Sequence, residues 1–279
     1  MGQKLRRGVQ FLFLALILLI SLNHLAAEQG WQIPLVGSAS LHAICPFGGV
    51  VSIYQLLATG DLVRKIHESA IVLMGGVFLL ALLFGPVFCG WICPLGTVQE
   101  LVGKIGQRLL GKRYNKIVPR KIDFLARNLR YLVLAWVIYM TAATGTLVFS
   151  EYDPYFTLFN LWSEEVALSG ILILLVVLGS SLLVERPFCK YACPYGAVLG
   201  LTNLFRFFGI RRNASTCINC KACDRSCPMN IQVSTASTVR DHQCISCLKS
   251  TSEASCPVSQ TLELRTHSFE RLKSVAVKK

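Results

Sequence analysis

Four stretches of apolar residues divide the first two thirds of the chain. They cover about residues 9–27, 69–88, 131–149 and 166–184. Each is close to the roughly 20 residues that an α-helix needs to cross the hydrocarbon core of a bilayer. The pattern therefore predicts four transmembrane helices. The first is expected to be a retained anchor and not a cleaved signal peptide, because its apolar run is long and no clean cleavage motif follows it.

The composition is that of a membrane protein and not of a soluble enzyme. Hydrophobic residues make up 53% of the 279 residues and charged residues 15%, and the mean hydropathy is +0.52. In a soluble protein the net charge of +13 would suggest nucleic acid, but the sequence has no basic face with interleaved aromatic residues. We therefore expect no nucleic-acid partner.

The basic residues fall on one side of a chain with four spans. Of the 28 Lys and Arg residues, all except Arg64 and Lys65 lie before the first span, between the second and third, or after the fourth. Basic residues are retained on the cytoplasmic side of membrane proteins. The sequence thus predicts a multi-pass protein of a prokaryotic cytoplasmic (inner) membrane, in contact with lipid, whose N- and C-termini are both cytoplasmic.

A short motif occurs twice at an offset of 100 residues. Residues 86–96 read PVFCGWICPLG, and residues 186–196 read RPFCKYACPYG. Each copy follows an apolar span, so the four helices are predicted to form two tandem two-helix repeats. Repeats of the same orientation are related by an axis along the membrane normal, which would bring the two motifs close together.

The repeated motif contributes two cysteines from each copy. These are Cys89, Cys93, Cys189 and Cys193. Because positions i and i+4 share one face of a helix, each pair can present its two thiols together. Four thiolates suit zinc or an iron–sulfur centre, which makes this a candidate metal or redox site at the membrane edge. The alternative is that each Cys-Pro-x-Gly turn only ends a helix and redirects the chain.

The strongest motif follows Arg212. The segment CINCKACDRSCP has the Cys-x2-Cys-x2-Cys-x3-Cys-Pro spacing of bacterial ferredoxins, in which the fourth cysteine ligates the other cluster. A second run, CISCLKSTSEASCP, is incomplete, because Ser250 stands where the regular pattern has a cysteine. The crossed ligation rule gives two sets of ligands. The first set is Cys217, Cys220, Cys223 and Cys256; the second is Cys227, Cys244 and Cys247, with Ser250 as a candidate fourth ligand.

The first set predicts a complete [4Fe-4S] cluster, and the second set is one cysteine short. Three outcomes remain open for the second site: a [3Fe-4S] cluster, a [4Fe-4S] cluster with a ligand other than cysteine, or no cluster. We therefore expect one or two clusters in this part of the chain. The module has few large apolar residues between its cysteines, so the clusters are expected to hold its fold.

These features divide the chain into three parts. Residues 1–200 are predicted to form a four-helix transmembrane domain that carries both Cys-x3-Cys-Pro motifs. Residues 205–265 form a ferredoxin-like α+β module, and residues 266–279 a basic tail. The expected fold class is a mainly α membrane protein with this small module on its cytoplasmic side.

Several other polar residues are candidates for binding. His42 and Cys45, in the loop between the first two spans, have the ligand types of copper or another soft metal. A quinone site needs polar groups beside an apolar slot, and the candidates are His24, Glu28, His67 and Glu68. All of these also fit turns or interfacial caps. Glu185 and Arg186 fit an ion pair at the membrane edge, and Trp91 fits an interfacial anchor or a residue packed on a metal centre.

The sequence resembles the polyferredoxin-type membrane proteins, which include the NapH-type quinol dehydrogenase component and the C-terminal halves of NosR-type and CcoG-type proteins. The resemblance rests on both Cys-x3-Cys-Pro motifs and on the run from Cys217 to Cys256, and it covers roughly residues 70–260. It implies electron relay between the quinone pool and a partner reductase. Ser250 departs from the family pattern, which leaves the second cluster in doubt.

The leading hypothesis is a membrane-bound iron–sulfur protein that relays electrons between the quinone pool, or another membrane donor, and a partner oxidoreductase. Whether it is itself a quinol dehydrogenase component stays open. One alternative is a copper or iron reductase, or an assembly factor for a metalloenzyme, in which His42 and Cys45 would matter most. Another is a redox-responsive membrane regulator.

Overall fold

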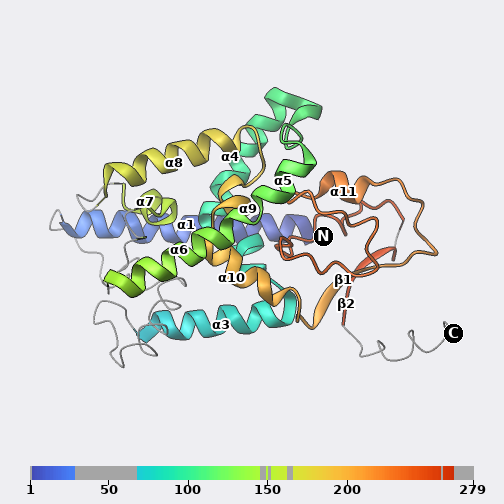
Figure 1. Cartoon of the computed structure of the whole chain (residues 1–279), viewed down its shortest axis with the longest axis horizontal. Coiled ribbons are helices and arrows are strands. Elements are labelled where there is room, and N and C mark those ends of the chain that lie inside the picture. Colours follow the sequence, from blue (N-terminus) through green and yellow to red (C-terminus); the bar gives the residue numbers. More distant parts are fainter. Residues whose placement is uncertain are drawn as a thin grey trace.

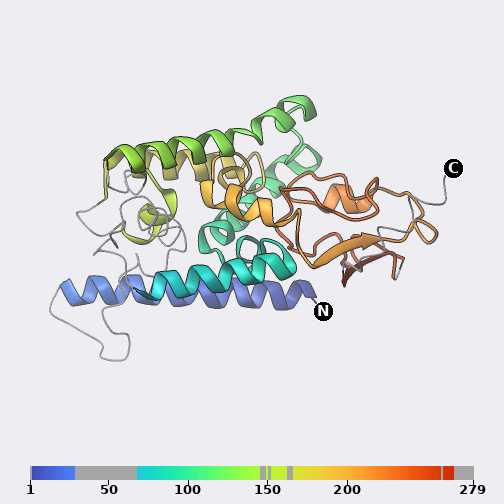
Figure 2. The same ribbon diagram turned by 60° about the horizontal axis from the view of Figure 1, so that its bottom comes forward.

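The computed structural model describes residues 2–28, 68–144, 149, 152–161, 166–258 and 260–266. Helices dominate this part of the chain, and four apolar helices form a bundle along the long axis of the molecule (Figure 1). These are α1 (Gly2–Glu28), α3 (Glu68–Phe84), α6 (Leu129–Thr144) and α8 (Leu168–Ser181). The cysteine-rich module lies at one end of the bundle, and the N-terminus of α1 lies at that same end (Figure 2).

The apolar helices differ in length. Within the described ranges, one helical segment, Gly2–Asn23 of α1, is long and apolar enough to cross a membrane by these criteria. The apolar segments Val72–Phe84 and Leu168–Ser181 are shorter, and α6 has 16 residues. The second helix ends at Phe84 and not near residue 88 as expected, because Gly85 adopts a left-handed backbone (φ 82°) and a proline follows it.

Each repeated motif forms a short helical turn that leads into a second helix. The first copy builds the π-helix η2 (Phe88–Ile92) and then α4 (Pro94–Leu110). The second copy builds α9 (Pro187–Tyr191) and then α10 (Pro194–Thr202). Proline occupies the first position of α4 and α10, where its missing N–H has no intrahelical partner to lose. The motif therefore redirects the chain, and whether it also holds a metal stays open.

The second helix formed by each motif packs against an apolar helix of the other half. Helix α4, from the first half, packs against α8 of the second, and α10 packs against α3 of the first. Helix α1 packs against α4, just as α6 packs against α10. These contacts are equivalent when the halves are interchanged, so the internal repeat of the sequence is also a repeat of packing.

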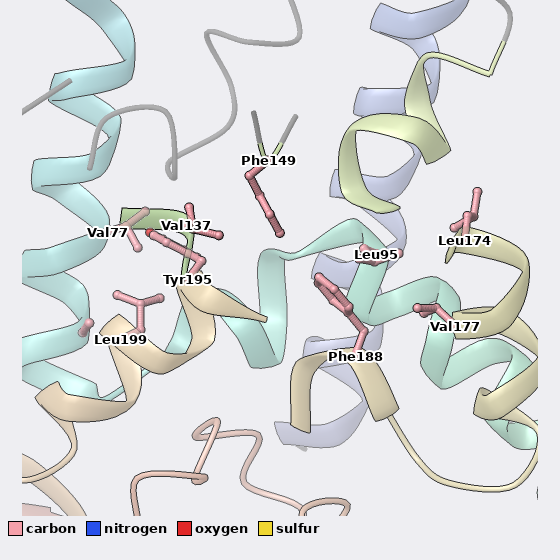
Figure 3. Packing of buried hydrophobic residues seen from close by; sticks show 10 residues of the cluster. Val77, Leu95, Val137, Phe149, Leu174, Val177, Phe188, Tyr195 and Leu199 are labelled. Atoms are coloured by element: carbon pink, nitrogen blue, oxygen red, sulfur yellow. The ribbon is translucent and has the colours of Figure 1, made fainter. Parts of the chain in front are cut away.

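The core of the bundle forms where these helices meet (Figure 3). Its labelled side chains come from both halves: Val77, Leu95, Val137, Phe149, Leu174, Val177, Phe188, Tyr195 and Leu199. The remaining short helices are η3 (Gly111–Arg113), α5 (Arg120–Ala126) and α7 (Pro154–Phe159). Helix α7 begins at an Asp153 cap, whose carboxylate accepts a hydrogen bond from the Tyr155 N–H (3.0 Å).

The C-terminal module is closed by a two-stranded antiparallel sheet. Strand β1 (Phe208–Arg212) pairs with β2 (Leu262–Thr266), with Phe208 opposite Thr266 and Arg212 opposite Leu262. Between the strands lie the short helix α11 (Ala222–Ser226) and irregular chain. The core beneath the sheet is small, and three of its buried members are cysteines: Cys223, Cys244 and Cys247.

Candidate iron–sulfur centres

Four cysteines of the module line one cavity. Cys217 and Cys220 come from the loop before α11, Cys223 from α11 itself, and Cys256 from the second run. Arg212 is among the other residues that line this space. These are the four residues that the crossed ligation rule places on one cluster.

The backbone of the loop at this first site has turns that suit a loop around a bound cluster. Asn219 and Lys221 both have positive φ angles (54°), and left-handed residues among right-handed ones turn successive N–H groups toward a common concave side. Hydrogen bonding by the Asn219 N–H, and then by Arg212, lowers the pKa of the half-buried Cys217 thiol. The loop thus favours the thiolate, which is the form that binds iron.

A second group contains Cys227, Cys244 and Cys247. Burial, and then the nearby Cys247 and Cys244, raise the pKa of the Cys227 thiol well above its usual range, so the three sulfurs lie near one another. Ser246 and Leu248 have positive φ angles (49° and 53°), which gives this loop the same kind of turns. Ser250 is buried.

The four thiols of the repeated motif also come together. The pKa of Cys89 is raised by burial and then by Cys93 and Cys189, and that of Cys193 by burial and then by the other three thiols. Burial and Cys189 raise the pKa of Cys93 to about 12. Without metal these thiols are therefore neutral, and binding a metal there would release protons.

The geometry of each pair differs from the expected single helix face. Cys89 belongs to η2, but the backbone of Cys93 has left the helical region (ψ 114°). Cys193 likewise precedes α10 and caps it, since its Sγ accepts a hydrogen bond from the Gly196 N–H (3.2 Å). The i, i+4 prediction is therefore wrong in detail, because proline starts a new helix directly after the second cysteine of each pair.

The four thiols are shared between two cores. Cys93 and Cys193, the second cysteines of the two motifs, pack against the bundle core. Cys189 packs against the core of the cysteine-rich module, and Cys89 packs against both. The motif cysteines therefore lie between the helical bundle and the core that contains Cys244 and Cys247.

Hydrogen bonds from side chains to backbone carbonyls hold the second cysteine loop onto the bundle. The Trp91 indole N–H donates a hydrogen bond to the Ser246 carbonyl (3.1 Å), and the Gln3 side chain donates one to the Cys247 carbonyl (3.0 Å). From α10's end, the Asn203 side chain donates to the Cys244 carbonyl (2.7 Å). The two roles expected for Trp91, an interfacial anchor or a residue packed on a metal centre, stay predictions.

The junction buries far more positive than negative charge. Among the residues that the structure describes, six cationic side chains are buried against two carboxylates. The cations are Arg6, Arg127, Arg130, Arg186, Lys190 and Arg206, and the carboxylates are Glu100 and Asp123. Sequence reasoning missed this, because it explained most basic residues by membrane topology.

The ion pairs of the junction also differ from the expected ones. Arg186 pairs with Glu100 (2.7 Å), which also binds Arg6 (2.7 Å), while Glu185 pairs with Lys249 (2.5 Å). The expected Glu185–Arg186 pair at the membrane edge is therefore wrong. Neighbours in sequence point to different partners here, since Arg186 begins α9 with a left-handed backbone (φ 53°).

The buried cations fit negatively charged clusters. Arg130 and Arg206 have no carboxylate partner among the described residues, and each has a buried Nε atom without a hydrogen-bond partner in that part of the chain. A buried charge without a counter-ion is strongly unfavourable. A cubane bound by four thiolates carries about two net negative charges when oxidised, so the donor set and its surroundings suit such a group.

Single-ion sites are not seen in the described residues. No three His, Cys, Asp or Glu side chains there come close enough to ligate one metal ion. In a cubane each thiolate binds a different iron, so the sulfurs stand farther apart than the ligands of one zinc ion.

The other candidate residues are placed only in part. His24 and Glu28 fall near the end of α1, and Glu68 is the first residue of α3. His42, Cys45 and His67 lie outside the described residues. The expected quinone and copper sites therefore stay predictions.

Comparison with known proteins agrees with the thiol chemistry. A family model described as a 4Fe-4S binding domain matches twice, at residues 66–113 and 166–212. The chain is 33% identical over 223 residues to the putative electron transport protein YccM of Escherichia coli, which covers 78% of this chain and 61% of the relative. It is 31% identical to an uncharacterized protein of Methanocaldococcus jannaschii, over 74% of this chain and 81% of the relative.

The ferredoxin-type protein NapH of Haemophilus influenzae is 28% identical, over 62% of this chain and 59% of that protein. The chain belongs to the ferredoxin-type 4Fe-4S electron-transport proteins. No solved structure matches it. Both family matches of this ferredoxin-type protein contain one Cys-x3-Cys-Pro motif and stop before Cys217, so the repeat itself carries the family signature.

Proposed function

We propose that this ferredoxin-type protein is bound to the membrane and relays electrons between the quinone pool and a partner oxidoreductase, as a quinol dehydrogenase component. The observation that carries the proposal is the position of the motif cysteines. Cys93 and Cys193 pack on the bundle core, and Cys189 on the core that contains Cys244 and Cys247. Thiols therefore continue from the bundle into the module.

The module would bind its clusters by crossed ligation. Iron–sulfur clusters take up and release single electrons, and their potentials depend on ligation, hydrogen bonds and exposure. The first would be held in the cavity by Cys217, Cys220, Cys223 and Cys256. The second would be held by Cys227, Cys244 and Cys247, as a three-iron cluster or as a four-iron cluster with a further ligand such as Ser250.

The four motif thiols would hold an additional centre at the membrane edge. Their mutual effects on pKa support it, because each of Cys89 and Cys193 is influenced by its partners from both motifs. Gln99 supports it as well: this fully buried side chain points its Nε2 at the Cys189 sulfur (3.7 Å). Hydrogen bonds to ligand sulfurs are among the factors that tune a cluster.

The bundle would cross the membrane four times, as two tandem repeats, with the module and both termini in the cytoplasm. The equivalent packing of the two halves supports this arrangement. So do exposed apolar side chains on the shorter helices, such as Val72 on α3, Leu132 on α6 and Val176 on α8, which would face lipid. In this proposal the division at residues 1–200, 205–265 and 266–279 separates bundle, module and tail.

The topology can be tested with reporter fusions. A fluorescent protein that folds only in the cytoplasm should fluoresce when fused after residue 279, and alkaline phosphatase should be active when inserted between α1 and α3. The opposite pattern at either position would reject the four-span arrangement.

The function can be tested with anaerobically purified protein. Iron and acid-labile sulfide are counted, the EPR spectrum is recorded, and a quinol is then added. Reduction of the clusters by quinol is the expected result. Reduction only by cytosolic donors, together with turnover of copper, would instead favour the metal reductase hypothesis of His42 and Cys45; a spectral change without turnover would favour a regulator.

A matched pair of variants separates electron relay from simple binding of quinol. In Cys217→Ser, the first cluster should be lost while quinol still reduces the remaining centres. In Cys93→Ser, the membrane-edge site is altered, and quinol should no longer reduce the module clusters. Equal reduction in Cys93→Ser and wild type would contradict a path through the motif.

A further inference from the structure

Arg206 is a buried arginine that lies beside the second group of cysteines. It lies between α10 and β1 in the chain and is 2% exposed. One of its terminal nitrogens, Nη1, lies 3.7 Å from the Cys244 sulfur and 3.2 Å from the Ser246 hydroxyl. Its other terminal nitrogen donates a hydrogen bond to the Val239 carbonyl.

Every partner of this guanidinium is formally neutral. Besides the groups just named, Nη1 reaches the Asn203 side-chain oxygen (3.2 Å), and Nε has no hydrogen-bond partner among the described residues. None of the ion pairs in the described part of the chain includes Arg206. Arginine does not lose its proton in proteins, so a positive charge is buried without a counter-ion.

Such a charge needs a negative partner in direct contact with it. Uncompensated buried charges are rare because the lost hydration is not replaced. The sulfur of Cys244 is the one group beside the guanidinium that becomes negative when it binds a metal. Cys227 and Cys247 lie in the same core and supply the neighbouring thiols.

We infer that Arg206 is the counter-ion of an iron–sulfur cluster held by Cys227, Cys244 and Cys247, and that it raises the reduction potential of that cluster. The inference rests on the proposed function and goes further, because it requires that the second site assembles in spite of Ser250. Reduction adds one negative charge to the cluster. A fixed positive charge and a hydrogen bond to a ligand sulfur both stabilise the reduced form more than the oxidised form.

The surroundings hold Arg206 in this position. Asn203, one turn earlier, accepts from Arg206 and donates to the Cys244 carbonyl, and the Ser246 hydroxyl donates to the Phe84 carbonyl (2.7 Å). Gly85 leaves the necessary space, because a Cβ there would lie 2.6 Å from the Ser246 hydroxyl. The end of α3 is therefore shaped around the guanidinium and the cysteine loop.

The deciding experiment is an EPR-monitored redox titration of the full-length protein, reduced with dithionite and without quinol or partner. Arg206→Gln should shift the midpoint of the second cluster to a more negative potential, or lose that cluster's iron. Arg206→Lys, which keeps the charge, should recover most of the wild-type potential. The exposed Arg265 serves as a control with the same change of charge, and Arg265→Gln should leave the midpoint unchanged.

A purely structural arginine would give a different pattern. If Arg206→Gln leaves both the iron content and the midpoint of the second cluster as in wild type, the inference is overturned. If the variant folds poorly, a double-mutant cycle on the free energy of unfolding decides. Arg206→Met should lower this free energy in the wild-type background. It should lower it much less in the Cys244→Ala background, where no cluster needs a counter-ion. Equal destabilisation in both backgrounds would also overturn it. Because dithionite replaces quinol, these results do not depend on the quinone proposal.

Discussion

The indole nitrogen of Trp91 donates a hydrogen bond to the carbonyl oxygen of Ser246, with 3.1 Å between the two atoms. Trp91 lies between the two cysteines of the first motif, and Ser246 lies between Cys244 and Cys247. One hydrogen bond therefore ties together two thiol-bearing segments that are far apart in sequence. The residue before Trp91 is Gly90, whose missing side chain leaves room for the Ile245 carbonyl.

The first prediction concerns this close approach. A Cβ on Gly90 would meet the Ile245 carbonyl oxygen at a distance that real Cβ atoms do not reach. Gly90→Val should therefore push the second cysteine loop away from η2, and overpacking of this kind costs about 1–3 kcal/mol. We expect a lower melting temperature in detergent and slower reduction of the module clusters by quinol.

Gly75→Val is the matched control. This glycine lies in α3, and nothing stands within 4 Å of a Cβ built there. The control should melt and transfer electrons nearly as wild type. If the two variants lose the same amount of stability, the effect at Gly90 comes from the added valine in general and not from the docked loop.

The second prediction tests crossed ligation. Cys256 lines the cavity of Cys217, although 38 residues separate the two in the chain. Cys256→Ala should therefore remove or convert to three-iron form the same cluster that Cys217→Ala affects, and leave the second EPR signal. Cys247→Ala should do the reverse. The measurement is EPR with an iron count, and a loss of the second signal in Cys256→Ala would reject the assignment.

The third prediction concerns the motif thiols. If Cys89, Cys93, Cys189 and Cys193 share a centre, Cys89→Ser should lower the iron content by one cluster and leave the EPR signal of the module intact. The reason is that Cys89 contacts both cores but lines no part of the first cavity. An unchanged iron count would reject a shared iron site at the motif.

The fourth prediction concerns the carboxylate that joins the two halves. Burial opposes the charged form of Glu100, but Arg186, Arg6 and Lys249 outweigh it and hold the pKa of this carboxyl far below its usual 4.5. Glu100→Gln would leave two buried arginines without their counter-ion. Removing one member of a buried pair costs about 3–5 kcal/mol, so we expect a large fall in the free energy of unfolding.

The pH dependence of this effect follows from the sign of the shift. A lowered carboxyl pKa contributes stability that is fully present above the unfolded pKa and is lost only as the pH falls toward the folded one. The difference in unfolding free energy between wild type and Glu100→Gln should therefore stay constant between about pH 6 and pH 8. A difference that changes steeply in this window would mean that another group carries the effect.

Much of the candidate chemistry could be read from local spacing. The run from Cys217 to Cys227 predicts a cluster loop because three of the four ligands of one cubane come from one short segment, and the structure places Cys217, Cys220 and Cys223 on one cavity. The duplicated motif was also visible, since identical residues recur at a fixed offset. The end of α3 at Phe84 was missed, although the Gly85–Pro86 signal was present in the sequence.

The buried charges could not be read in this way. Arg6, Arg130 and Arg206 are ordinary basic residues beside apolar spans or strands, and positive charge in such places is expected for reasons of topology. Arg130 and Arg206 donate hydrogen bonds to the His242 and Val239 carbonyls of the module, and Arg6 pairs with Glu100 of α4, so their positions depend on contacts between distant segments. Glu100 gave no signal either, because its partners Arg6 and Arg186 lie 94 and 86 residues away.

By itself the sequence determined the ligand types, their grouping into runs, the repeat and the apolar helices, because each depends on residues close together in the chain. Only the tertiary structure decided that the motif thiols lie between two cores and that the second cysteine loop rests on η2. The two copies of the motif have similar sequences, yet position 90 is a glycine where position 190 is a buried lysine. The module docks at one end of the bundle, and its position depends on contacts between distant segments that no local pattern contains.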